Sequence, residues 1–95
     1  MSYQQSVQLA QDTAVELVAA HPGKYQGKER LVDAVRSSLD DCTRQQARDG
    51  VEQAVSAGRI AEQPLTEEDR KKWLHGRGGA KGGGQALYPA ARAAT

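Results

Sequence analysis

Ninety-five residues with 13 Lys+Arg against 12 Asp+Glu carry a formal net charge of +1 and have room for one small domain. Only 38% of the residues are hydrophobic, so we expect a core too small for a buried active site. No run of about 18 apolar residues is present, and the first residues have neither the basic nor the apolar region expected of a secretion signal. The single cysteine, Cys42, cannot form an internal disulfide, which fits a reducing cytoplasm. We therefore expect a soluble intracellular binding module or a subunit of something larger, rather than an enzyme, a membrane protein or a secreted protein.

The first predicted element is a helix over residues 3–20. Its apolar stripe, at spacings of three and four, consists of Tyr3, Val7, Ala10, Ala14, Leu17 and His21. The helix should end before Pro22, because proline disfavours helical backbone at the residue that precedes it. Further apolar residues beside the stripe predict that the helix either lies deep in the core or also forms the seam of a homodimer, which Ala14→Glu should then disrupt.

Two more helices are predicted over residues 28–58, separated by a tight turn. The second of them should begin with a capping box, in which the Thr43 side chain accepts from the Gln46 amide and the Gln46 side chain reaches back. Gly50 lies in the middle of this helix, where glycine is unfavourable, and therefore indicates close packing against another helix. Gly58 is a typical C-terminal cap.

The chain after these helices is predicted to form a hairpin. Residues 59–63 should be extended, and Thr66 should cap a single helical turn. Two strands are predicted at Lys72–His75 and Gln85–Tyr88, on either side of the glycine-rich loop Gly76–Gly84. A long hairpin with a basic tip is the simplest interpretation of this pattern.

Trp73 and Tyr88 would face each other on these two strands. We expect them to form a cross-strand pair that closes the hairpin onto the helices, with base stacking as the alternative role. Residues 89–95 are expected to be a disordered tail. Residues 1–88 then form one domain, mainly α with a small β-hairpin (α+β).

Charge is distributed unevenly along this chain. Residues 51–69 contain five acids and one base, whereas residues 70–95 contain six bases and no acid. A basic end of this kind indicates a polyanion partner, usually DNA or RNA, although a solvated basic tail would have the same composition.

Residues 28–60 resemble the winged helix-turn-helix superfamily. Residues 43–60, TRQQARDGVEQAVSAGRI, are similar to its recognition helix and exit, and residues 70–88 are similar to its wing. The resemblance covers about two thirds of the chain and identifies no subfamily, and residues 62–71 are longer and more acidic than in a minimal example. It implies a three-helix winged helix-turn-helix fold that binds double-stranded DNA in the cytoplasm, or at the nucleoid if bacterial, as a transcriptional regulator or a replication or partition accessory factor.

The start of the third helix carries the residue types that read bases. Arginine offers two donors to guanine, and glutamine offers a donor and an acceptor to adenine. Arginine and lysine on a glycine backbone can approach a narrow minor groove, and a helix N-terminus can face a phosphate. The predicted DNA-binding residues are Thr43, Arg44, Gln45, Arg48, Arg77 and Lys81.

Acidic residues near this helix oppose the DNA interpretation, because they would repel phosphates. They are Asp40, Asp41, Asp49 and Glu52. They favour an alternative, a winged-helix protein–protein interaction module that does not bind DNA. A second alternative is a non-specific single-strand nucleic-acid binder that uses mainly its basic, glycine-rich end.

No catalytic residue, metal, cofactor or small-molecule ligand is predicted. The glycines lack the spacing and the Ser or Thr of a phosphate-binding loop. His21, His75 and Cys42 have no zinc-binding spacing. We interpret Cys42 as a small, half-buried residue; the alternative is a redox-sensitive thiol whose pKa is lowered by Arg44 and the helix N-terminus.

Overall fold

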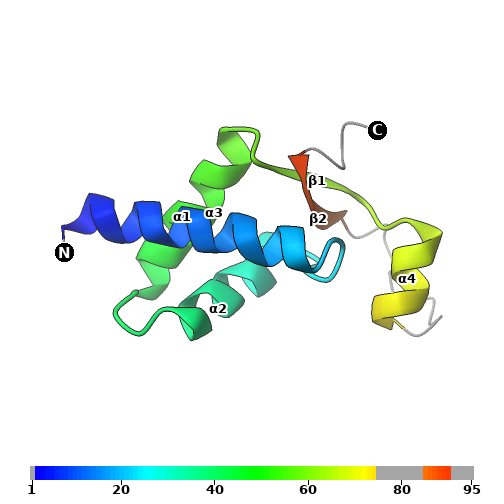
Figure 1. Ribbon diagram of the computed structural model, residues 1–95, viewed down its shortest axis with the longest axis horizontal. Coiled ribbons are helices and arrows are strands. Elements are labelled where there is room, and N and C mark those ends of the chain that lie inside the picture. Colours follow the sequence, from blue (N-terminus) through cyan, green and yellow to red (C-terminus); the bar gives the residue numbers. More distant parts are fainter. Residues whose placement is uncertain (1, 75–84, 91–95) are drawn as a thin grey trace.

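The computed structural model describes residues 2–74 and 85–90 (Figure 1). In chain order its elements are α1 (Tyr3–Ala20), α2 (Lys28–Ser38), α3 (Arg44–Ser56), β1 (Ile60–Pro64), α4 (Glu67–Leu74) and β2 (Gln85–Pro89). The fold is mainly helical with one small antiparallel strand pair, which confirms the predicted α+β class. The strands lie between the three main helices and α4, and α4 lies at the end of the long axis away from the N-terminus (Figure 1). Within the described ranges, no helix has both the length and the apolar character needed to cross a membrane.

The helix predicted over residues 3–20 is confirmed as α1. It begins with a capping box that the sequence analysis missed: the Gln5 amide donates to Ser2 Oγ at 3.2 Å, and the Ser2 amide donates to Gln5 Oε1 at 3.0 Å. Val7, Ala10 and Ala14 of its apolar stripe are buried, Leu17 and His21 are half-buried, and Tyr3 is 49% exposed. Val18, which is not part of the stripe, is fully buried. The stripe therefore faces the core of this chain.

Small side chains bring α1 and α3 close together, as Gly50 had indicated. A Cβ at Gly50 would lie 2.6 Å from the Ala10 Cβ and 2.7 Å from the Gln11 amide nitrogen. Ala14 and Ala47 are fully buried in the same core. The two helices can approach this closely only because these positions have little or no side chain.

Both predicted ends of α3 are confirmed. The Gln46 amide donates to Thr43 Oγ1 at 3.1 Å, and the Thr43 amide donates to Gln46 Oε1 at 2.9 Å. At the other end, Gly58 has a φ of 76°, and the Arg59 amide donates to the Ala54 carbonyl at 2.9 Å. This hydrogen bond, together with that from the Gly58 amide to the Val55 carbonyl, forms a Schellman motif.

The strand predicted at Lys72–His75 is wrong, because residues 72–74 belong to α4; His75 lies outside the described residues. The partner of β2 is instead β1, the segment predicted to be extended, with Ala61 opposite Tyr88. Thr66 caps α4 by accepting from the Asp69 amide at 3.1 Å. The acidic first turn and basic last turn of α4 suit the helix macrodipole, so the single predicted turn continues as a helix.

The predicted Trp73–Tyr88 pair is also wrong. Trp73 lies on α4, and its indole N–H donates to the Pro22 carbonyl at 2.9 Å. The Tyr88 hydroxyl donates to Asp69 Oδ2 at 2.8 Å, so both aromatic residues hold α4 in place, at two different points. The region predicted as the wing, residues 70–88, therefore contains the end of α4 and most of β2, with residues 75–84 outside the described part.

The segment after α1 lies along the second edge of β2. The Gly23 amide donates to the Leu87 carbonyl at 3.1 Å, and the Leu87 amide donates to the Tyr25 carbonyl at 3.0 Å. Leu87 packs in the helical core, whereas Tyr88 belongs to a second buried cluster with Leu65. The helices and the second cluster thus occupy opposite faces of β2, as alternation along a strand requires.

The tail predicted over residues 89–95 begins later than expected. Pro89 extends β2 and pairs with Ile60, and residues 91–95 lie outside the described part.

Candidate nucleic-acid interface

The first two turns of α3 bring together four of the six predicted DNA-binding residues. Thr43 caps the helix, and Arg44, Gln45 and Arg48 follow it with largely solvent-accessible side chains. The Thr43 hydroxyl accepts from the Gln46 amide, and its own hydrogen takes no part in the cap. Arg77 and Lys81, in the glycine-rich segment, lie outside the described residues.

Both arginines form ion pairs with acidic residues of α2. Arg44 binds Asp33 Oδ1 at 2.7 Å and Glu29 Oε2 at 2.9 Å, and Arg48 binds Glu29 Oε1 at 3.1 Å. The hydrogen bond that Arg44 donates to Asp33 is the main reason that the pKa of Arg44 is raised above its usual range. All four side chains are at least 40% exposed, so these pairs contribute little to stability and can exchange for another anion.

Gln45 belongs to a second polar group on the same face. Its Nε2 donates to Asp49 Oδ1 at 2.8 Å, and the Tyr3 hydroxyl donates to the other oxygen of that carboxylate. The hydrogen bond from Tyr3, followed by that from Gln45, lowers the pKa of Asp49, so this carboxylate stays charged. A glutamine amide carries a second N–H and an acceptor oxygen beside the one N–H that this hydrogen bond uses. Sequence reasoning had treated Tyr3 only as part of the apolar stripe and missed this contact.

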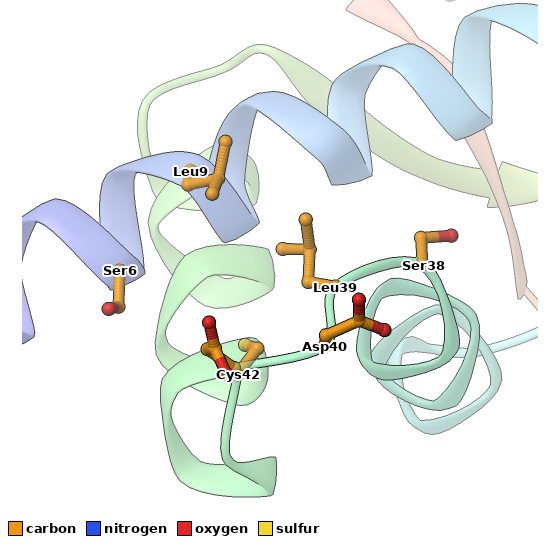
Figure 2. A pocket seen from close by; sticks show the side chains of 7 residues that line it. Ser6, Leu9, Ser38, Leu39, Asp40 and Cys42 are labelled. Carbon is orange, nitrogen blue, oxygen red and sulfur yellow. The ribbon is translucent and has the colours of Figure 1, made fainter. Parts of the chain in front are cut away.

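A pocket of about 280 Å³ lies between α1 and the turn that joins α2 to α3 (Figure 2). Leu9 and Leu39 give it apolar walls, and Asp40 and Cys42 line it from the turn. Burial raises the pKa of the Cys42 thiol, with Arg36 opposing the shift. The thiol therefore remains protonated at neutral pH, which favours the small half-buried residue over the reactive thiol. Within the described ranges, no three His, Cys, Asp or Glu side chains are grouped so that they could hold a metal ion.

Basic and aromatic residues meet at the other end of α1, in a group that sequence reasoning did not find. Lys24 Nζ lies 5.8 Å from the Trp73 ring centroid and 5.6 Å from that of Tyr25, and Lys72 Nζ lies 4.9 Å from that of Trp73. His21 meets the Trp73 ring edge-on at 6.0 Å. The group joins residues that follow α1 to residues of α4, about fifty positions later in the chain. It therefore forms only when α4 packs against the segment that follows α1.

The chain matches no protein-family model, and comparisons with curated proteins and with solved structures give no match either.

Proposed function

We propose that this protein is a DNA-binding module of the winged helix-turn-helix type that places α3 in the major groove. The observation that carries the proposal is the exposed start of α3, where a capped helix presents Arg44, Gln45 and Arg48 on one surface. Arginine and glutamine at the N-terminal end of a recognition helix are the side chains that read guanine and adenine. Thr43, at the helix start, is placed to bind a phosphate.

The order of the elements supports the same proposal. Two helices joined by a short turn precede a strand that pairs with β2, and the segment after α1 lies on the free edge of β2. This arrangement resembles the three helices and small sheet of a winged helix. The helix α4 lies in the connection between the two strands, so the wing of this protein would carry a helix as well as the basic segment with Arg77 and Lys81.

The partner would be double-stranded DNA in the cytoplasm, or at the nucleoid if bacterial. The protein would then act as a transcriptional regulator or as an accessory factor in replication or partition. It would not be an enzyme. A homodimer through the N-terminal helix would give the symmetric binding that most helix-turn-helix proteins use.

The ion pairs on α3 favour a second candidate function, a protein–protein interaction module that does not bind DNA. Arg44 and Arg48 are already paired with Glu29 and Asp33, and a DNA phosphate would have to displace these carboxylates. The acid-rimmed pocket of Figure 2 adjoins the same turn. A protein partner could use both features without this competition.

Selection of DNA fragments by the purified protein, followed by sequencing at physiological salt, tests the proposal. We expect a few strongly enriched sites for the wild type and loss of this enrichment in Arg44→Gln/Arg48→Gln. Arg30→Gln/Arg36→Gln is the matched control, because both residues are exposed on α2 and their replacement also removes two positive charges.

Three results would contradict the proposal. Uniform recovery that disappears with modest added salt would mean phosphate attraction alone. Binding that needs residues 76–95 but not the arginines would support the single-strand binder. No recovery at all would support the protein-interaction module.

A further inference from the structure

The side chains around Trp73 form a positively charged surface that is distinct from the start of α3. Tyr3, at the first turn of α1, contacts Asp49 of α3, whereas His21, at the other end of α1, contacts Trp73. An 18-residue helix is about 27 Å long, so the two surfaces lie at opposite ends of the molecule. Figure 1 shows α4 at the end of the long axis away from the N-terminus.

Trp73 is held in a fixed position and acts as a platform for two lysines. Its indole N–H is bound by the Pro22 carbonyl at 2.9 Å, and the His21 ring packs against it edge-on. The ammonium groups of Lys24 and Lys72 both lie within about 6 Å of its ring centroid, the range in which cation–π attraction acts. The ring therefore reduces the freedom of two side chains that are usually mobile.

The two lysines of this surface are not held in ion pairs among the described residues. Among the described residues, the ion pairs join acids to Arg44, Arg48 and Arg59, and neither Lys24 nor Lys72 takes part in one. On α4 itself, Asp69 is buried and bound to Thr66 and Tyr88. Glu67 and Glu68 are exposed in the first turn of α4, and neither forms an ion pair with Lys72. Two cations held beside one ring repel each other, and an anion between or across them would relieve that repulsion.

We propose that Lys24 and Lys72, positioned by Trp73, form a binding site for the sugar–phosphate backbone of nucleic acid. A nucleic-acid strand offers a regular series of negative charges about 3.4 Å apart along the helix axis, which suits two fixed ammonium groups better than an isolated anion does. Lysine binds phosphate as a point charge and reads no base, so the site supplies affinity without sequence preference.

The composition of the chain around Lys72 supports a polyanion as the partner. Residues 70–95 contain six bases and no acid, so the attraction at Lys72 continues along the sequence. The site shares its partner class with the proposed function but does not depend on base reading by α3. The two proposals can therefore fail separately.

Trp73 is the only tryptophan of the chain, so its fluorescence reports on this site alone. The full-length protein is titrated with a labelled duplex of arbitrary sequence at several salt concentrations, while Trp73 emission and the anisotropy of the duplex are followed. We expect a saturable change in emission, because phosphate binding draws the lysines away from the ring. The logarithm of the association constant for the duplex should fall linearly with the logarithm of the salt concentration. Lys24→Gln and Lys72→Gln should each make this slope shallower by about 0.9.

Lys71→Gln is the matched control, because Lys71 is an exposed neighbour on α4 with no contact to the ring among the described interactions. It should leave the salt slope unchanged. Circular dichroism of the three variants should match that of the wild type, since each replaces an exposed side chain.

Several outcomes would overturn this site. If Lys24→Gln and Lys72→Gln bind like Lys71→Gln while Arg44→Gln/Arg48→Gln loses binding, α3 is the DNA contact and the Trp73 site is not. An emission change with polyglutamate but not with the duplex would identify an acidic protein as the partner. Absence of any duplex binding at low salt would remove both proposals. Conversely, binding that is lost only in the lysine variants would support this site and contradict the role of α3.

Discussion

Gly50 sets the distance between α1 and α3. It faces Ala10 and the backbone of Gln11, and the space for a side chain at this position is already occupied. Sequence reasoning predicted close packing here, because glycine in a helix interior is costly unless something requires it. The sequence does not show that the helix packed against Gly50 is α1.

Gly50→Ala should destabilise the protein by about 1–3 kcal/mol, because the new Cβ would overlap with the backbone of α1. This loss exceeds the gain in helix propensity of about 1 kcal/mol. Urea denaturation followed by circular dichroism measures the change. Gln53→Ala, at an exposed position of the same helix, should change stability by less than about 0.5 kcal/mol. A more stable Gly50→Ala variant would mean that α1 and α3 are further apart in solution.

Trp73 and Tyr88 illustrate what residue type alone leaves open. Two aromatic residues on either side of a glycine-rich segment are compatible with a cross-strand pair, and that was the prediction. In the structure, Trp73 binds the Pro22 carbonyl just after α1 and Tyr88 binds Asp69, because the chain between the two strands forms α4. An aromatic side chain with one polar group packs well in either arrangement.

At the scale of elements, α2 and α3 are joined by exposed ion pairs as well as by the core. Glu29 and Asp33 hold Arg44 and Arg48, which are the arginines that we expect to contact DNA. The carboxylates therefore compete with phosphates for the same guanidinium groups.

Glu29→Gln/Asp33→Asn should raise the affinity of the protein for its selected DNA several-fold at low salt. The substitution frees both arginines and removes two negative charges beside the phosphates, and the gain should shrink as salt screens them. Fluorescence anisotropy at two salt concentrations measures the effect. Glu16→Gln/Glu62→Gln, at exposed positions of α1 and β1, is the control for the loss of two negative charges. A weaker complex in the double variant would show instead that the carboxylates orient the arginines for binding.

The helix α4 is the element that the sequence analysis described least well. Thr66 was recognised as a cap, but residues 72–74 were assigned to a strand. Eight residues provide little periodicity, and only Trp73 and Leu74 are apolar among the last five of them. The contacts of Trp73 with Pro22 and of Asp69 with Tyr88 stabilise this helix, and both are tertiary.

At the scale of the whole molecule, the first helix is the centre of the core. Val7, Ala10, Ala14 and Val18 are at most 2% exposed. Ala14 cannot therefore lie in a dimer seam, and its replacement does not test one. A homodimer through α1 would have to use the outer side of the helix, where Leu9 is 42% exposed.

Ala14→Glu should unfold most of the protein, because it buries a charge with no partner at a cost of at least about 3 kcal/mol. Loss of the helical circular dichroism signal would show this. Ala19→Glu, at an exposed position of the same helix, should leave the protein folded. A folded Ala14→Glu protein would contradict the core position of α1.

A homodimer through α1 is tested by sedimentation velocity of the wild type and of Leu9→Glu. We expect the wild type to be a dimer and the Leu9→Glu variant to be a monomer.

The sequence alone determined the three main helices, both ends of α3 and the α+β class. Each of these depends on local chemistry: the 3.6-residue spacing of apolar side chains, capping by Thr and Gln, and the positive φ that glycine permits. It also placed Thr43, Arg44, Gln45 and Arg48 together, because one capped helix start contains them all.

Tertiary structure decided the strand partner of β2, the position of α4, and the neighbours of the candidate DNA-binding residues. Ile60–Pro64 is too short to specify its partner, and neither the pairing of Glu29 with Arg48 nor that of Lys24 with Trp73 leaves a local pattern. Such contacts join segments that are 19 or more residues apart, and they form only when the whole chain has packed around α1. Local sequence patterns determine where helices begin and end. The ion pairs and hydrogen bonds between different elements depend instead on how those elements pack together.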